Sequence, residues 1–112
     1  MPGPEPVIKF GLPEDKLTRY LLNIAHPKGK AGFFIGVGFD PSDPDTLASA
    51  LFHHLFAPTS ETNSKPHPLG FGDNIKVVGP LLSPDGRNPN VLAIWLVDPK
   101  TNVGSFVTAY PN

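Results

Sequence analysis

The chain has 112 residues, a formal net charge of −1 and no cysteine. This length suits one domain, because two separate cores would each bury too little apolar surface to offset chain entropy. The lack of cysteine excludes disulfides, thiolate zinc sites and thiol catalysis, and the near-neutral charge requires any nucleic-acid role to depend on a local basic patch. With 15 Pro and 11 Gly residues, we expect many short elements.

The first half of the chain predicts helices. Residues 1–6 predict a flexible Pro-rich arm, and residues 7–10 predict a short edge strand. Pro13 suits the first position of a helix, and the apolar residues between 17 and 24 then follow i, i+3, i+4, i+7 spacing. Asp43 and Pro44 start a second helix, whose buried stripe extends from Leu47 to Leu55 before Pro58 ends it.

Two stretches are harder to assign. Residues 28–39 are apolar at a helical spacing, but their glycines each oppose a helix by about 1 kcal/mol. A helix and a pair of short extended turns therefore both stay open for this segment. Residues 59–72 are polar and punctuated by Pro and Gly, which predicts a mobile loop.

The last third predicts an antiparallel β-meander from residues 75–82, 91–97 and 103–110, joined by short segments rich in turn formers. The middle strand is apolar on both faces, which predicts a central position, and Thr108 and Tyr110 are expected to share a face with Phe106. We therefore predict that residues 1–112 form a single α+β domain. Two or three N-terminal helices would pack on a C-terminal antiparallel β-meander of three to four strands.

The histidines near the middle of the chain predict no metal site. His53 and His54 are adjacent on a helix and point about 100° apart, so they are not placed to share an ion as an i, i+4 pair is. His54 lies on the apolar stripe, which predicts a packed and hydrogen-bonded side chain, whereas His53 and His67 are expected to face solvent. We predict neither a metal nor another cofactor.

A basic cluster follows the first helix. His26 can exchange a proton near neutral pH, Lys28 and Lys30 can neutralise a phosphate, and the glycines beside them let the backbone approach a ligand. The same residues also suit a helix C-terminus, where His and Lys complement the negative end of the helix. Both interpretations remain open from the spacing.

Three residues of the meander are further candidates for contact with a phosphate or a base. Arg87 lies at the tip of the first hairpin and is either a turn residue or a bidentate phosphate contact. Thr108 and Tyr110 are ordinary residues for a strand, yet they also place two hydroxyls and an aromatic ring on the last strand.

Short motifs in a characteristic order resemble an uncharacterised bacterial domain family, found as small stand-alone proteins and at the C-termini of polymorphic secreted toxins. The resemblance covers roughly residues 10–111. The motifs are KLTRYLLN at 16–23, HP at 26–27, GKA at 29–31, FF at 33–34, GF at 38–39, VVGPL at 77–81, PDGR at 84–87, IW at 94–95 and VTAYP at 107–111.

The resemblance implies a helix-then-meander layout similar to the barnase–colicin–RelE-like ribonucleases. It also implies a toxin that acts in the cytoplasm, or is delivered into the cytoplasm of a target cell, with a cognate immunity or antitoxin protein as partner. This chain departs from the family pattern at two points: the segment between His26 and Lys30 is shortened, and Gly32 stands where a polar or basic residue is usual. If that position binds phosphate in relatives, we expect activity to be weakened or absent here.

We therefore predict a metal-independent endoribonuclease of the bacterial toxin type, with RNA as partner. His26, Lys30 and Tyr110 would be catalytic, and Lys28, Arg87 and Thr108 would bind the substrate. The alternative is a non-catalytic module that binds another protein, which the near-neutral charge favours. A toxin with a target other than RNA is a third possibility. The N-terminus lacks the basic and apolar residues of a secretion signal, and no apolar run is long enough to span a bilayer, so no membrane contact is expected.

Overall fold

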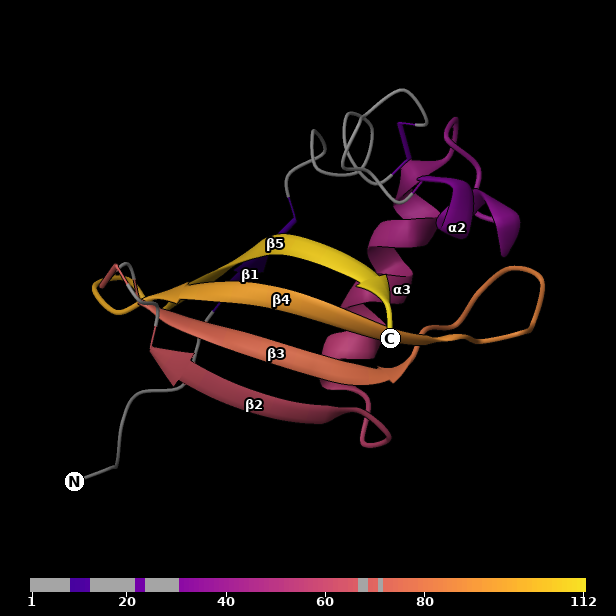
Figure 1. Ribbon diagram of the computed structural model, residues 1–112. Helices are drawn as coiled ribbons and strands as arrows, with labels where there is room; N and C mark the ends of the chain where they lie inside the picture. The colour runs from indigo at the N-terminus through magenta and orange to yellow at the C-terminus, as the bar shows by residue number, and fades with distance from the viewer. Residues whose placement is uncertain (1–8, 13–21, 24–30, 67–68, 71) are drawn as a thin grey trace.

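The fold is a curved five-stranded sheet with a helix across one face (Figure 1). It is seen in a computed structural model, which describes residues 9–12, 22–23, 31–66, 69–70 and 72–112. Helix α3 (Pro44–Phe56) lies against the sheet, and the short helix α2 (Ala31–Gly36) lies beside α3. Neither of the two helices in the described part of the chain is long and apolar enough to cross a membrane.

The sheet has the strand order β1-β5-β4-β3-β2. Its strands are β1 (Lys9–Gly11), β2 (Glu61–Pro66), β3 (Asp73–Pro80), β4 (Asn90–Asp98) and β5 (Val103–Pro111). Strands β2 to β5 pair antiparallel in sequence order, whereas β1 pairs parallel with β5. The sheet is therefore mixed, and a meander forms four of its five strands.

The core lies between α3 and the sheet face that it covers. Trp95 of β4 is fully buried, with its ring centroid 5.6 Å from that of Phe10, 5.7 Å from Phe52 and 5.2 Å from Phe106. Phe106 lies on the neighbouring strand β5, Phe10 lies on β1 beyond it, and Phe52 lies on α3, so Trp95 joins both layers. Large aromatic side chains bury much apolar area per residue, which lets a short chain form a core.

Several sequence predictions are confirmed. Pro44 begins α3, with Asp43 at its N-cap, and the buried stripe of the helix includes Leu47 and Leu55. Strand β4 is the central strand, as its two apolar faces predicted. Within residues 28–39, the segment Ala31–Gly36 is helical, which selects one of the two open alternatives for that part.

The predicted fold class is wrong in its balance of helices and strands. The segment 59–72, predicted as a loop, contains strand β2, and the strand near the N-terminus joins the same sheet through β5. Strand β2 was missed because all six of its residues are exposed, so burial gives its sequence no alternating pattern. The first helix, predicted at about residues 13–24, and the arm at 1–6 lie outside the described residues apart from Leu22 and Asn23.

The predicted shared face of Phe106, Thr108 and Tyr110 is also wrong for Phe106. The β4–β5 register shifts between Ile94 and Trp95, so that Ile94 pairs with Thr108 while Trp95 pairs with Phe106. The extra residue in β5 forms a β-bulge, and a bulge reverses the face on which the following side chains point. Phe106 therefore enters the core, whereas Thr108 and Tyr110 lie on the opposite face of the sheet.

Candidate functional site

The sheet face opposite α3 brings polar side chains of four strands together. We call this surface the open face. Cross-strand pairing arranges it in three rows, because directly opposed residues on neighbouring strands point to the same side. The rows are Glu61, Val78, Leu92 and Tyr110; Asn63, Lys76, Ile94 and Thr108; and Lys65, Asn74, Leu96 and Ser105.

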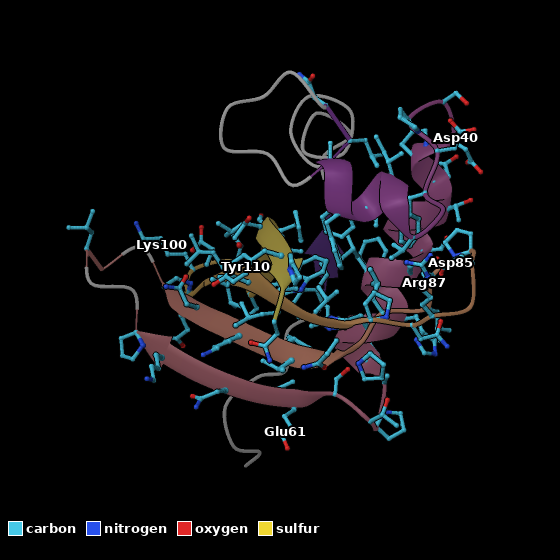
Figure 2. The ribbon with its side chains drawn as sticks, turned by 45° about the vertical axis from the view of Figure 1, so that its right-hand side comes forward. Asp40, Glu61, Asp85, Arg87, Lys100 and Tyr110 are labelled. Atoms are coloured by element: carbon cyan, nitrogen blue, oxygen red, sulfur yellow. The ribbon has the colours of Figure 1, made fainter. Side chains whose placement is uncertain are left out.

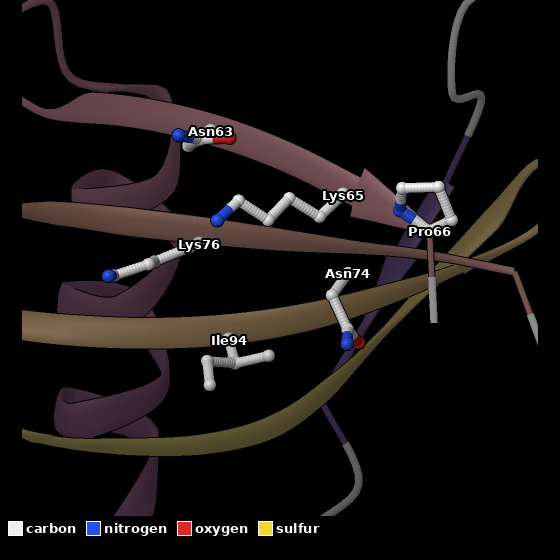
Figure 3. Close-up of a pocket in the computed structure, with 6 residues that line it drawn as sticks. All are labelled: Asn63, Lys65, Pro66, Asn74, Lys76 and Ile94. Carbon is white, nitrogen blue, oxygen red and sulfur yellow. The ribbon is translucent and has the colours of Figure 1, made fainter. Parts of the chain in front are cut away.

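A shallow hollow of about 280 Å³ lies on the open face (Figure 3). Its lining combines two lysines and two amides with an apolar floor and end wall: Asn63, Lys65, Asn74, Lys76, Ile94 and Pro66. Figure 3 shows these side chains in front of the strands, with α3 behind the sheet. We call the hollow lined by these six residues the base hollow.

A second hollow of about 210 Å³ adjoins the first. The two share Asn63 and Lys76, and the second also includes Glu61, Thr62 and Val78 in its lining. We call this the acidic hollow after Glu61, which lies on the same face as Lys76. An ammonium group therefore stands where the two hollows meet, with a carboxylate on one side of it.

The two lysines of the base hollow are arranged to receive an anion. Lys65 pairs with Asn74 and Lys76 pairs with Asn63. Each lysine therefore lies opposite an amide, and the two lysines are diagonal neighbours. Diagonal neighbours of this kind have Cα atoms roughly 7–8 Å apart, so two positively charged side chains start from neighbouring positions of one surface. Among the residues that the structure describes, an ion pair joins Arg87 to Asp85, and neither lysine takes part in one.

Two glycines fix the strands that carry this surface. Gly79 of β3 lies so close to the start of β2 that an added Cβ would stand 2.5 Å from the Ser60 Oγ. Gly72 precedes β3 with φ of +126°, a conformation that favours glycine, and an added Cβ would meet the Val97 carbonyl oxygen. The lack of a side chain at Gly79 allows β2 to approach β3, and the pairing of the two strands brings Asn63 and Lys65 beside Lys76 and Asn74.

The structure assigns different places to the predicted site residues. Thr108 and Tyr110 lie on the open face with the lysines, both half-buried. Arg87 lies in the loop between β3 and β4, 3.0 Å from Asp85, and lines neither hollow (Figure 2). The remaining three predicted residues, His26, Lys28 and Lys30, lie outside the described residues.

The Asp85 carboxylate explains the position of Arg87. It accepts hydrogen bonds from the Arg87 backbone N–H at 3.0 Å and from the Ser83 hydroxyl at 2.8 Å. These bonds, together with the charge of the guanidinium, lower the pKa of Asp85. The Arg87 side chain thus pairs with a carboxylate of its own turn, in agreement with the turn interpretation of the sequence.

His54 is confirmed as a packed, hydrogen-bonded residue of the core. Its Nε2 lies 3.1 Å from the Gly79 carbonyl oxygen and 2.9 Å from that of Val91, so this nitrogen carries the proton and donates. Burial is the main reason that the pKa of His54 is lowered, and the two carbonyl bonds oppose that effect. The side chain belongs to α3, on the far side of the sheet from the open face, while His53 is exposed as predicted.

Sequence reasoning missed the residues that line the two hollows. One signal was available: Asn63 and Lys65 are two residues apart, and so are Asn74 and Lys76, which places each pair on one face of a strand. Only the antiparallel pairing of β2 with β3 brings these two pairs together. Among the described residues, no group of three or more His, Asp or Glu side chains is placed to hold a metal ion.

A model of the family described as a domain of unknown function (DUF6883) matches residues 4–112. This finding agrees with the resemblance to an uncharacterised domain family. A comparison with curated proteins and with solved structures finds no match to the chain.

Proposed function

The chain belongs to DUF6883, a domain family of unknown function, and from that premise and the open face we propose that it is a metal-independent endoribonuclease of the bacterial toxin type. RNA would lie along the open face, with its backbone on Lys65 and Lys76. The sequence motifs that resemble toxin-associated domains support the toxin context and a cognate immunity or antitoxin protein. Neither the resemblance nor the sheet by itself carries the RNA assignment.

The observation that carries the proposal is the set of side chains on the open face. Two lysines without carboxylate partners in the described part of the chain lie on one sheet surface with Thr108 and Tyr110. A local basic patch is what a chain of net charge −1 needs in order to bind a polyanion. A half-buried tyrosine on the same surface suits stacking against an unpaired base.

The proposed reaction uses the 2′-hydroxyl of RNA as the nucleophile. A general base removes its proton, the oxygen attacks phosphorus, and the 5′-oxygen leaves with a proton from a general acid. The products end in a 2′,3′-cyclic phosphate and a 5′-hydroxyl. His26 is the proposed imidazole for one transfer, and Glu61, beside Lys76 in the acidic hollow, is the carboxylate on the open face for the other.

The lysines would stabilise the charge that develops on the phosphorane. An ammonium group placed where this charge appears lowers the barrier more than it lowers the energy of the bound substrate. Lys76 lies between the two hollows and is the residue that we assign to the scissile phosphate. Lys28 and Lys30, in the segment that resembles the family motif, would contribute further positive charge.

The test is incubation of the purified chain with total RNA in EDTA, followed by end-group analysis. We expect fragments with 2′,3′-cyclic phosphate ends, and a large loss of cleavage for His26→Ala and for Lys76→Met. Lys100→Met is the matched control, since Lys100 is exposed in the β4–β5 turn and lines neither hollow (Figure 2). Intact RNA, or equal cleavage by His26→Ala, would refute the assignment.

A second candidate is a non-catalytic module that binds another protein. The observation that favours it is β2, an edge strand with all six residues exposed and no strand on its outer side in the described sheet. Such an edge can accept a strand of a partner through backbone hydrogen bonds. Induced expression in bacterial cells separates the two candidates, because a nuclease arrests growth and a binding module leaves growth unchanged.

A further inference from the structure

We infer that the base hollow binds the purine base of the nucleotide next to the scissile phosphate, in single-stranded RNA. The inference rests on the proposed function and adds a substrate preference to it. It places the base between Asn63 and Asn74, over Ile94, and the adjoining phosphate at Lys76. Cleavage would then occur beside purines.

The base hollow is smaller than a typical ligand pocket, which limits it to a small occupant. Its volume of about 280 Å³ lies just below the range of typical small-molecule pockets, which begins at roughly 300 Å³. The hollow is shallow, and its floor is a single strand position, so it admits one flat group against Ile94 with Pro66 as an end wall. A paired base inside an A-form helix keeps its edges within the grooves, so the occupant has to be an unpaired base.

The polar side chains of the base hollow favour purines by their hydrogen-bonding types. A carboxamide offers a donor and an acceptor side by side, which is the pattern that pairs with the N6 and N7 atoms of adenine. The NH2 group of a carboxamide can also donate to the O6 or N7 acceptor of guanine. A carboxylate is the usual partner of the cytosine amino group, and no carboxylate is among the described residues that line this hollow.

The position of Lys76 connects the base to the site of cleavage. Lys76 and Asn63 line both hollows, so a nucleotide in the base hollow directs its phosphate toward the hollow that contains Glu61. Lys65, diagonal to Lys76, is placed to hold the phosphate on the other side of the same nucleotide. The surface therefore has separate places for a base and for two phosphates, and the Glu61 carboxylate lies beside them.

The test uses mononucleotides and nuclear magnetic resonance of the full chain. The ¹⁵N-labelled protein is titrated with 3′-AMP, 3′-GMP, 3′-UMP, 3′-CMP and inorganic phosphate. We expect amide shifts centred on Asn63, Lys65, Asn74 and Lys76. Purine nucleotides should bind roughly fivefold or more tightly than pyrimidine nucleotides, the discrimination expected of one bidentate contact to a base.

Two double variants test whether the base hollow causes the purine preference. Asn63→Ala/Asn74→Ala should lose the purine preference and keep the affinity for inorganic phosphate, whereas Lys65→Met/Lys76→Met should bind phosphate and every nucleotide more weakly. Ser64→Ala is the matched control, because Ser64 is exposed on the other side of β2 and should leave all five affinities unchanged. These side chains lie on the exposed edge strand or on its neighbour, so a dispersed amide spectrum should show that each variant is folded.

The outcomes separate this inference from the proposed function. Equal affinity for the four nucleotides, shifts centred elsewhere, or an unchanged preference in Asn63→Ala/Asn74→Ala would overturn the inference. RNA cleavage without preference for purines would also overturn it while leaving the nuclease in place. Purine binding by a chain that leaves RNA intact would support the base hollow and refute the nuclease.

Discussion

Replacement of both Lys65 and Lys76 by methionine should change how RNA binding depends on salt. Methionine keeps a side chain of similar length and removes the charge. For single strands, the logarithm of the binding constant falls with the logarithm of salt concentration with a slope of about −0.7 for each phosphate neutralised. Two lysines on the open face, each at one phosphate, therefore contribute a slope of about −1.4.

This difference in slope gives a measurable affinity ratio. Between about 50 and 200 mM salt, the unmodified chain should lose roughly sevenfold more affinity than Lys65→Met/Lys76→Met. The ratio compares two chains, so phosphate contacts made by other residues cancel. Each single variant should show half of the change in slope, provided that each lysine neutralises its own phosphate.

Fluorescence anisotropy with a labelled single-stranded RNA measures the effect. Methylation of every 2′-hydroxyl removes the proposed nucleophile, so binding is recorded without cleavage. Lys100→Met removes the same charge outside both hollows and should keep the slope of the unmodified chain. If the double variant and the unmodified chain show the same slope, the phosphates do not lie at Lys65 and Lys76, and the open face is not the RNA-binding surface.

Three further predictions concern the acidic hollow, the core and the strand contact beneath the site. Glu61→Gln should reduce RNA cleavage by about 100-fold or more in single-turnover assays with little change in RNA affinity, as expected for loss of a general base; undiminished cleavage would exclude Glu61 from proton transfer. Because the pKa of His54 is lowered from 6.5 in the folded chain, its neutral form is favoured there, so the free energy of unfolding should be highest above that pH and fall as the pH drops below it. Chemical denaturation at a series of pH values measures this fall in the free energy of unfolding. The fall should persist in His53→Ala and become smaller in His54→Phe. Gly79→Ala should lower the free energy of unfolding by about 1–3 kcal/mol, because the new Cβ overlaps Ser60, and an unchanged thermal midpoint would contradict the close approach of β2 to β3.

Local sequence was sufficient for elements that carry their own signals. Pro44 and Asp43 mark the start of α3, and the spacing of its apolar residues marks its buried face, including His54. Strand β4 is apolar on both faces, which predicted a strand with a neighbour on each side, and β4 lies between β5 and β3. These predictions succeeded because a proline at the first helical position and the spacing of apolar residues are signals from residues close together in the chain.

The candidate site was predictable only in part. Tyr110 and Thr108 were singled out as hydroxyl groups on the last strand, and the open face contains both. Arg87 was open to two interpretations, a turn residue or a phosphate contact, and its guanidinium lies 3.0 Å from Asp85 of its own turn. The sequence shows an acidic residue two positions before Arg87, and the structure shows that the two side chains form an ion pair.

What the sequence by itself determined is the helix 44–56, the central apolar strand and the turns that connect the meander. Tertiary structure alone decided that β2 exists, that β1 joins β5, and that the β-bulge turns Phe106 into the core and Thr108 outward. It also decided that Asn63 and Lys65 meet Asn74 and Lys76 on one surface. The physical reason is that strand pairing satisfies backbone hydrogen bonds between distant segments, so the register, and with it the face on which each side chain lies, is a property of the pair and not of either strand.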